Sequence, residues 1–238
     1  MTEKEAKELL DKIVGQVLGY ANPLSLEQFM QKFTFDIRLP QKVTDAMDGS
    51  ETWASSTNPL KFVKMEYARG GEINKIMGAD SEYRRPARQL KDMDDILSAW
   101  NEINLTTTER YKESLNIGQS DNIDRSENVW RSQDIHNSKN IMLSDGVFGS
   151  EFVAASQRSV NSTFCIRIED SGECSNSFGI SWSGKITNSF FLHDTGDMQD
   201  SMFCTNISGQ RYMVANMQYD EVEYKRLRDI VARWILTS

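Results

Sequence analysis

The chain has 238 residues, with 35 acidic against 27 basic side chains and a formal net charge of -8. This length is enough to bury a substantial core, in one large domain or two small ones. The acidic balance argues against nucleic acid and anionic membranes as partners, because both require clustered Lys and Arg. No apolar run approaches the ~20 residues of a membrane span, and residues 1–10 are charged rather than signal-like. We therefore expect a protein that is not secreted through a signal peptide.

Two helices are expected at the amino-terminal end. Apolar residues recur at helical spacing and predict a first helix over residues 2–19, with one face made of Leu9, Leu10, Ile13, Val14, Val17 and Leu18. Ser25 and Gln28 form a capping-box pattern that predicts the start of a second, short helix. Residues 33–43 alternate and contain Pro40, which favours an extended segment lying on another element.

Residues 44–89 are expected to be irregular. They contain several glycines and the basic cluster Arg84, Arg85 and Arg88. So long an irregular stretch often becomes ordered on a partner, which makes it a candidate docking segment. The following residues, 90–104, predict a helix with Met93, Ile96, Leu97 and Trp100 on one face. This helix would deliver the chain to the central region.

The central region, residues 114–221, divides into nine rows of twelve residues, such as SENVWRSQDIHN and SKNIMLSDGVFG. Each row consists of two hexads, and in the first rows a serine opens each hexad with an aliphatic residue three positions later. A helix cannot keep a six-residue period on one face, because its apolar stripe recurs every 3.6 residues. Short strands separated by tight turns can, so the repeat predicts a parallel β-solenoid in which equivalent residues stack about 4.8 Å apart.

Asparagine and glycine are expected at the corners of the coils, because both tolerate left-handed backbone. The candidates are Asn116, Asn122, Asn128, Asn140, Gly146 and Gly149. A six-residue submotif fits either a flattened, two-sided coil of twelve residues or a triangular coil of eighteen. The series Asn116, Asn128, Asn140 recurs at twelve, and so does the series Phe178, Phe190, Met202. These series favour a coil of twelve.

After the fourth row the serine and aliphatic positions change places. From Ile168 onward aliphatic residues or cysteine open most hexads, and serine or threonine follows three positions later. We interpret this exchange as a three-residue slip within residues 157–167, equivalent to a bulge or a half-strand offset. The solenoid is expected to continue through it.

The carboxyl-terminal residues 220–238 predict an amphipathic helix. Asp220 and Glu223 supply a capping pattern, and the apolar stripe comprises Val222, Leu227, Ile230, Val231 and Trp234. The last coil of a solenoid exposes apolar positions and unpaired strand edges. We therefore expect this helix to be a cap, with the amino-terminal helices as candidates for the other end. The expected fold is mainly β, in three parts: a docking region over residues 1–113, a solenoid over 114–219 and a capping helix over 220–238.

Residues that carry chemistry are few. Cys165, Cys174 and Cys204 show no C-x-x-C spacing, so neither a disulfide framework nor a zinc site is indicated. The serines lie in no nucleophile elbow, and stacking accounts for their period. His193 precedes Asp194, but adjacent strand residues point to opposite faces, which disfavours a His-carboxylate pair. We predict no catalytic, cofactor-binding or metal-binding residue, and no cofactor.

The stretch from Asn188 to Tyr224, with NSFFLHD and DSMFCTNISGQRYMVANMQYDEVEY, resembles uncharacterised solenoid-like repeat proteins of large tailed bacteriophages and candidate-phylum bacteria. The resemblance covers about the second half of the repeat region. Those relatives carry cysteine at many ladder positions and have an amino-terminal zinc ribbon, whereas this chain keeps three cysteines and lacks the ribbon. The resemblance implies a solenoid and no known activity.

The sequence favours a non-enzymatic structural protein within a larger assembly such as a phage virion. In this hypothesis the solenoid is a rigid scaffold, residues 44–89 dock on neighbouring protein subunits, and the protein lies in the virion or the cytoplasm. The candidate interface residues are Trp53, Tyr67, Tyr83, Arg84, Arg85, Arg88, Trp130, Phe148 and Trp182. Two alternatives stay open. One is a trimeric hexapeptide-repeat-type transferase with sites at His193 or His136, and the other is a carbohydrate-binding solenoid with Phe178, Phe190 and Met202 as an exposed row.

Overall fold

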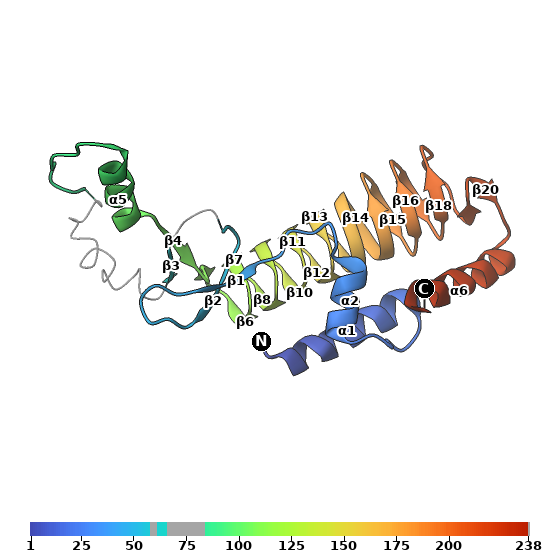
Figure 1. The fold of residues 1–238 in the computed structure, drawn as a ribbon. Coiled ribbons are helices and arrows are strands. Elements are labelled where there is room, and N and C mark those ends of the chain that lie inside the picture. Colours follow the sequence, from blue (N-terminus) through green and yellow to red (C-terminus); the bar gives the residue numbers. More distant parts are fainter. Residues whose placement is uncertain (58–60, 66–83, 238) are drawn as a thin grey trace.

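The computed structural model describes residues 1–57, 61–65 and 84–237. It is mainly β, and its centre is a parallel β-solenoid flanked by helices on one side (Figure 1). The first coils contain β5 (Tyr111–Lys112), β6 (Leu115–Gly118), β7 (Asp121–Asp124), β8 (Glu127–Trp130), β9 (Gln133–His136), β10 (Lys139–Met142), β11 (Asp145–Phe148), β12 (Glu151–Ala154) and β13 (Gln157–Val160). The later coils contain β14 (Thr163–Ser181), β15 (Gly184–Thr187), β16 (Phe190–His193), β17 (Gly196–Gln199), β18 (Met202–Thr205), β19 (Met213–Val214) and β20 (Met217–Gln218).

The predicted coil of twelve residues is confirmed. Strands of successive coils pair in parallel with partners twelve residues apart, as in Ile123 with Ile135 and Val129 with Ile141. Each coil contributes one strand to each of two stacks, so that β6, β8, β10 and β12 form one stack and β5, β7, β9, β11 and β13 form the other. A triangular coil of eighteen residues is excluded by this register.

The coil has four corners. From Glu113 to Ala215, every third residue has a positive φ, which gives four left-handed residues in each coil of twelve. In the coils made of four-residue strands, two of them lie within strands and two lie between strands. Asn116, Asn122, Asn128, Asn140, Gly146 and Gly149 all occupy these positions, as predicted from their tolerance of left-handed backbone.

The inward residues form four columns, because one residue in every three points into the coil. In the first half two columns are serine and two are aliphatic, and from Ser120 onward their residues are almost fully buried. Ser144 illustrates what the serines do. Its hydroxyl donates to the carbonyl of Met142 at 2.8 Å and accepts the N–H of Ser156, one coil later, at 3.1 Å. A buried backbone N–H without a partner is costly. The serine hydroxyls supply partners for backbone N–H groups that form no hydrogen bond between strands.

The exchange of serine and aliphatic columns takes place without a bulge. The twelve-residue register continues through it, with Val153 opposite Cys165 and Ser159 opposite Ser171. What shifts is the position of the strands along the chain: β13 begins at Gln157 and β15 at Gly184, which is two coils and three residues later. Of the two interpretations given from the sequence, the half-strand offset of three residues is therefore confirmed and the bulge is wrong. Serine lies in the breaks between strands in both halves, as Ser120 does between β6 and β7 and Ser189 between β15 and β16. When the serine positions shift by three residues, the strand boundaries shift with them.

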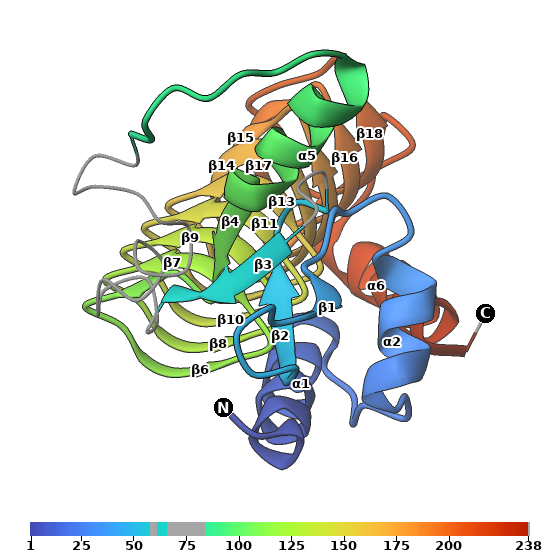
Figure 2. The same ribbon diagram turned by 60° about the vertical axis from the view of Figure 1, so that its left-hand side comes forward.

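A helical layer covers one side of the solenoid. It comprises α1 (Glu3–Leu18), α2 (Leu26–Phe33) and α6 (Glu221–Thr237), which lie on the same side in Figures 1 and 2. Beneath it runs a column of outward, apolar residues that recur every twelve positions and belong to one buried cluster with the helices: Trp130, Met142, Ala154, Ile166, Phe178, Phe190 and Met202. This lateral core is separate from the core inside the coils.

The predicted helix ends are confirmed. Thr2 caps α1 with a complete capping box to Glu5, and Gly19 ends it in the left-handed conformation. Ser25 and Gln28 form the expected box at α2. The side chain of Asp220 accepts the N–H of Glu223 at 2.9 Å at the start of α6.

The helices flank the solenoid instead of closing its ends. The carboxyl-terminal helix is present as predicted, but it turns back along the side of the coils toward α1 (Figure 1), where Arg228 donates to the carbonyl of Val17 at 2.9 Å. At the end of the solenoid, β19 and β20 form an antiparallel hairpin. The expectation that the amino-terminal helices cap the first coil is likewise wrong, because their apolar faces join the lateral core.

The region before the solenoid contains more regular structure than expected. Strands β1 (Gln41–Thr44) and β2 (Glu51–Ala54) form an antiparallel hairpin, and β3 (Lys61–Lys64) pairs in parallel with β4 (Leu105–Thr108). Two strands therefore lie within the stretch 44–89 predicted to be irregular. Within this region the Thr52 and Thr108 hydroxyls lie 2.7 Å apart. Ser55 Oγ donates to Asp121 of β7 at 2.8 Å and joins the region to the first coils.

Candidate protein-docking site

Helix α5 (Met93–Ile103) immediately precedes β4 and has no buried residue. The predicted apolar face is present, but it is uncovered: Met93 is 61%, Ile96 45%, Leu97 44% and Trp100 49% exposed. Leu90, just before the helix, and Ile103, at its end, are also exposed. In Figure 1 the helix stands beyond the first coils, away from the solenoid and its lateral helices. An amphipathic helix normally buries such a face, so α5 is the surface of the described chain that is best suited to dock on another molecule.

Local hydrogen bonds explain why this segment is helical. The Asp92 side chain accepts the N–H of Asp95 at 2.9 Å and caps the first turn. At the other end Arg85 Nη1 donates to the carbonyl of Ala99 at 3.1 Å, and Glu102 is paired with both Arg85 and Arg88. Cations beside the last turn also complement the helix dipole.

Two residues of the arginine cluster predicted as an interface, Arg85 and Arg88, therefore stabilise the last turn of α5. Arg85 and Arg88 line an open groove of about 460 Å³ together with Leu90, Trp100 and Ile103. Arg84 is exposed. The structure thus brings Arg85 and Arg88 to the helix and gives them an apolar surface to border. The sequence showed both the helix and the cluster, but not that they meet.

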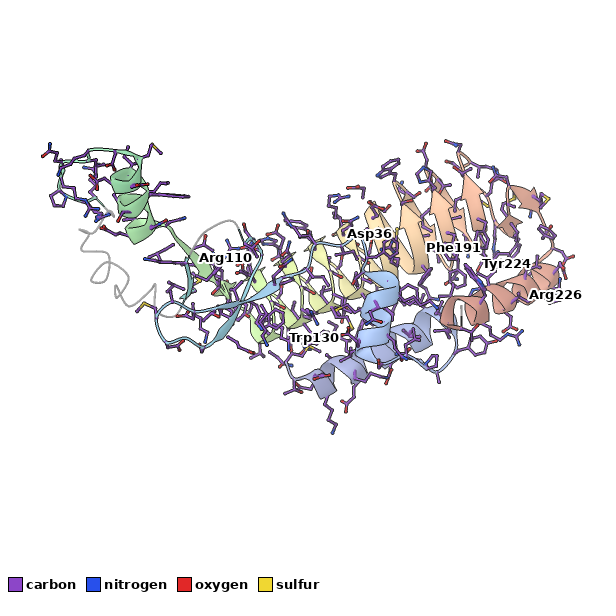
Figure 3. All side chains as sticks on the ribbon, in the orientation of Figure 1. Asp36, Arg110, Trp130, Phe191, Tyr224 and Arg226 are labelled. Carbon is purple, nitrogen blue, oxygen red and sulfur yellow. The ribbon has the colours of Figure 1, made fainter. Side chains whose placement is uncertain are left out.

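The other interface candidates are scattered. Trp53 is half-buried, with the Arg131 guanidinium 5.5 Å from its ring centroid. Trp130 is only 4% exposed, because it lies in the lateral core, so it is not a surface anchor. Phe148 and Trp182 are exposed on different coils and do not adjoin α5. Tyr67 and Tyr83 lie outside the described residues. Figure 3 shows Trp130 at the solenoid and Arg110 beside β4, well apart from α5.

The two histidines have neighbours that differ from those considered in the sequence. His136 stacks on Phe148 with ring centroids 4.9 Å apart, and its Nδ1 lies 3.8 Å from a carboxylate oxygen of Asp124. The Nδ1 of exposed His193 lies 3.0 Å from the hydroxyl of Ser181, one coil earlier, and not against Asp194. Ser181 and His193 are twelve residues apart, so the coil length alone predicts that they lie next to each other in successive coils. The row Phe178, Phe190 and Met202 is core and cannot serve as an exposed carbohydrate platform.

The cysteines are buried free thiols. Burial raises the pKa of the Cys165 thiol far above its usual range and that of Cys174 to about 11. A thiol must ionise to act as a nucleophile or a metal ligand, so these residues are suited to packing rather than to chemistry. Among residues 1–57, 61–65 and 84–237, no cluster of His, Cys, Asp and Glu has the arrangement of a metal site. None of the helices in that part of the chain combines the length and apolar character needed to cross a membrane.

An ion pair connects the docking region to the solenoid. Asp121, which is 1% exposed, accepts hydrogen bonds from Arg110 Nε at 3.0 Å and Nη2 at 2.9 Å. Burial opposes ionisation of this carboxyl, but the hydrogen bonds from Arg110 and Ser55 outweigh it and hold the pKa of Asp121 below its usual value. This ion pair therefore holds the residues just after β4 against the first coils. Helix α5 precedes β4 and is joined to the coils through it.

Neither a protein-family model nor a curated protein sequence matches the chain. The assignment of a function therefore depends on the geometry described above.

Proposed function

We propose that this chain is a non-enzymatic structural protein of a larger assembly, such as a phage virion, in which the solenoid is a rigid scaffold and α5 docks on neighbouring protein subunits. The exposed apolar face of α5 carries the proposal. An isolated helix of 11 residues is marginal in water, because helices shorter than about 12–15 residues depend on packing for their stability. A subunit that covers Met93, Ile96, Leu97 and Trp100 would supply that packing.

The solenoid suits the scaffold role for a physical reason. Its interior satisfies buried backbone groups through serine hydroxyls along both halves, and its lateral helices cover the apolar outer column that runs from Trp130 to Met202. Most hydroxyls of the serine columns have backbone partners, as those of Ser144 and Ser177 do. The docking segment proposed from the sequence, residues 44–89, is accordingly redefined as α5 with the arginines that border it. The proposal implies a location in the virion or the cytoplasm.

Oxidative footprinting tests the docking role. The protein is exposed to hydroxyl radicals within the particle or cell extract from which it comes, and separately as an isolated chain diluted until it is monomeric. Met93 and Trp100 should be oxidised several-fold more slowly in the native setting, because a neighbouring subunit covers them. Trp182, which is 59% exposed and belongs to the solenoid, is the internal control and should not change. Equal oxidation of Met93 and Trp100 in both settings would contradict the proposal.

The contact between Ser181 and His193 supports a second candidate, a hexapeptide-repeat-type transferase that acts as a trimer. The imidazole Nδ1 can accept the proton of the Ser181 hydroxyl across 3.0 Å, which is the geometry of an activated nucleophile. Thermal-shift measurements with acyl-coenzyme A donors, on the wild-type chain and on His193→Ala, test it. Donor-dependent stabilisation that is lost in the variant would favour the transferase. Absence of any shift would leave the structural role as the better explanation.

A further inference from the structure

The large apolar residues in and beside α5 are arranged as a palindrome. Read inward from both ends of residues 90–103, Leu90 matches Ile103, Lys91 matches Glu102, Met93 matches Trp100, and Ile96 is adjacent to Leu97 at the centre. Every large apolar residue of the segment thus has a large apolar counterpart at the same distance from the midpoint, whereas the small Ala99 is matched by Asp94. The one basic residue has an acidic counterpart.

A palindrome of this kind is self-complementary in an antiparallel helix pair. Where two copies of a helix run in opposite directions about a two-fold axis, residues whose numbers have a constant sum lie at the same level. With the axis between Ile96 and Leu97, Met93 lies level with the Trp100 of a second copy, and Ile103 lies level with its Leu90. All six exposed apolar side chains are then covered by one another. A two-fold interface closes on itself, so the pairing ends at a dimer.

The charges at the two ends of the helix select the antiparallel arrangement. The first turn is acidic, with Asp94 and Asp95 following the capping residue Asp92. The last turn is bordered by Arg85 and Arg88. Antiparallel pairing brings the acidic turn of each copy toward the arginines of the other, and Lys91 toward Glu102. Parallel pairing would bring the acidic turns together, which is unfavourable.

The position of α5 leaves room for this contact. The helix stands clear of the coils in Figure 1 and is joined to them through β4. We infer that α5 is a homodimerisation element, and that two chains pair through their α5 helices in antiparallel orientation with the two-fold axis between Ile96 and Leu97. This inference rests on the docking role proposed above and names a second copy of the chain as the partner.

The mass of the full chain in solution is the first test. Light scattering coupled to size-exclusion chromatography should give twice the monomer mass of 27.2 kDa. Trp100→Asp should give a monomer, because it places a charge in the centre of the apolar contact. Trp182→Asp is the matched control, since Trp182 is at least as exposed but lies on the solenoid, and it should remain a dimer. Far-UV circular dichroism of both variants verifies that the solenoid is folded.

Disulfide trapping then tests the register. The native cysteines are buried, so a single cysteine introduced at the surface is the one that oxidation can link. Leu97→Cys lies next to the two-fold axis and should form an intermolecular disulfide under mild oxidation. Met93→Cys should not, because its own copy lies about 10 Å away along the axis at 1.5 Å per residue, beyond the roughly 7 Å that a disulfide spans between Cα atoms. A mixture of Met93→Cys and Trp100→Cys chains should form the mixed disulfide.

Each other result has a definite meaning. Disulfides at Met93 and not at Leu97 would overturn the antiparallel arrangement. A wild-type monomer that forms none of these disulfides would overturn self-pairing, as would a dimer that persists in Trp100→Asp. If the chain is a monomer but Met93 and Trp100 are protected from oxidation in the native setting, the docking role stands and its partner is a different protein. If they are also unprotected, both the docking role and the self-pairing fail.

Discussion

The hydroxyl of Ser156 accepts a hydrogen bond from the backbone N–H of Ile168, one coil later, at 3.0 Å. This contact joins the last serine of an interior column to the first aliphatic residue that succeeds it. A serine therefore supports the coil that follows it, whatever residue stands there. The columns can change from serine to aliphatic residues without any change in the spacing of the coils.

Removal of one serine hydroxyl should destabilise the solenoid. In Ser144→Ala the buried N–H of Ser156 loses its acceptor, while the carbonyl of Met142 keeps the N–H of Ala155. We expect a loss of about 1–3 kcal/mol in the free energy of unfolding, measured by urea denaturation. Ser208→Ala is the control, because Ser208 is exposed, and its effect should stay within about 0.5 kcal/mol. Equal effects of the two substitutions would mean that the serine columns add no stability.

Replacement of Gly179 and of Gly184 by alanine should change the free energy of unfolding by different amounts. Gly179 has φ +67°, and a Cβ there would lie 3.0 Å from Phe191 Cδ1. Gly184 lacks a positive φ, and the nearest atom to its Cβ is 3.7 Å away. Gly179→Ala should cost about 1–2 kcal/mol in the free energy of unfolding, whereas Gly184→Ala should be nearly neutral. A thermal melt of each variant checks this, and an equal loss at both positions would contradict the assigned corner geometry.

The buried thiol of Cys174 should make stability depend on alkaline pH. Burial raises the pKa of Cys174 from 9.0 to about 11, so the folded chain holds the proton more tightly than the unfolded chain. The contribution is fully present below pH 9 and is lost as the pH rises toward 11, with a slope of up to about 1.4 kcal/mol per pH unit. Cys174→Ala should show a shallower decline in this window in urea titrations at several pH values. Identical slopes would show that Cys174 ionises as readily in the folded chain as in the unfolded chain.

The pair of Asp121 and Arg110 should hold the docking region to the first coil. Asp121→Asn removes a buried carboxylate that Arg110 and Ser55 both contact, and should cost about 3 kcal/mol. Hydrogen exchange should accelerate in β2 and β4. Because the pKa of Asp121 is lowered, the wild-type chain should lose this contribution as the pH falls below 3.8. Asp170→Asn, which removes an exposed partner of Arg158, is the control and should cost less than about 1 kcal/mol.

The sequence predicted the solenoid, its twelve-residue coil and the helix caps because these depend on local, repeated chemistry. Serine at a fixed period, asparagine at corners and Ser25 with Gln28 each specify a nearby backbone geometry. The lateral core was not predicted, since the residues of its outward column are all apolar but differ widely in size, as Trp130, Ala154 and Met202 do. For the same reason the sequence alone does not reveal that Trp130 is buried. The apolar face of α5 was predicted, but amphipathicity alone does not reveal whether the rest of the chain covers it.

The constant register has a consequence for changes in the length of this protein. The interior repeats every six residues, whereas the apolar column under α1 and α6 recurs every twelve. Duplication of a full row would extend the molecule by one strand spacing, about 4.8 Å, and leave each outer column aligned. Duplication of a single hexad would preserve the interior equally well but rotate the later coils by half a turn, which would carry Phe178 and Phe190 to the side opposite the helices. The helical layer therefore restricts growth of the solenoid to multiples of twelve residues.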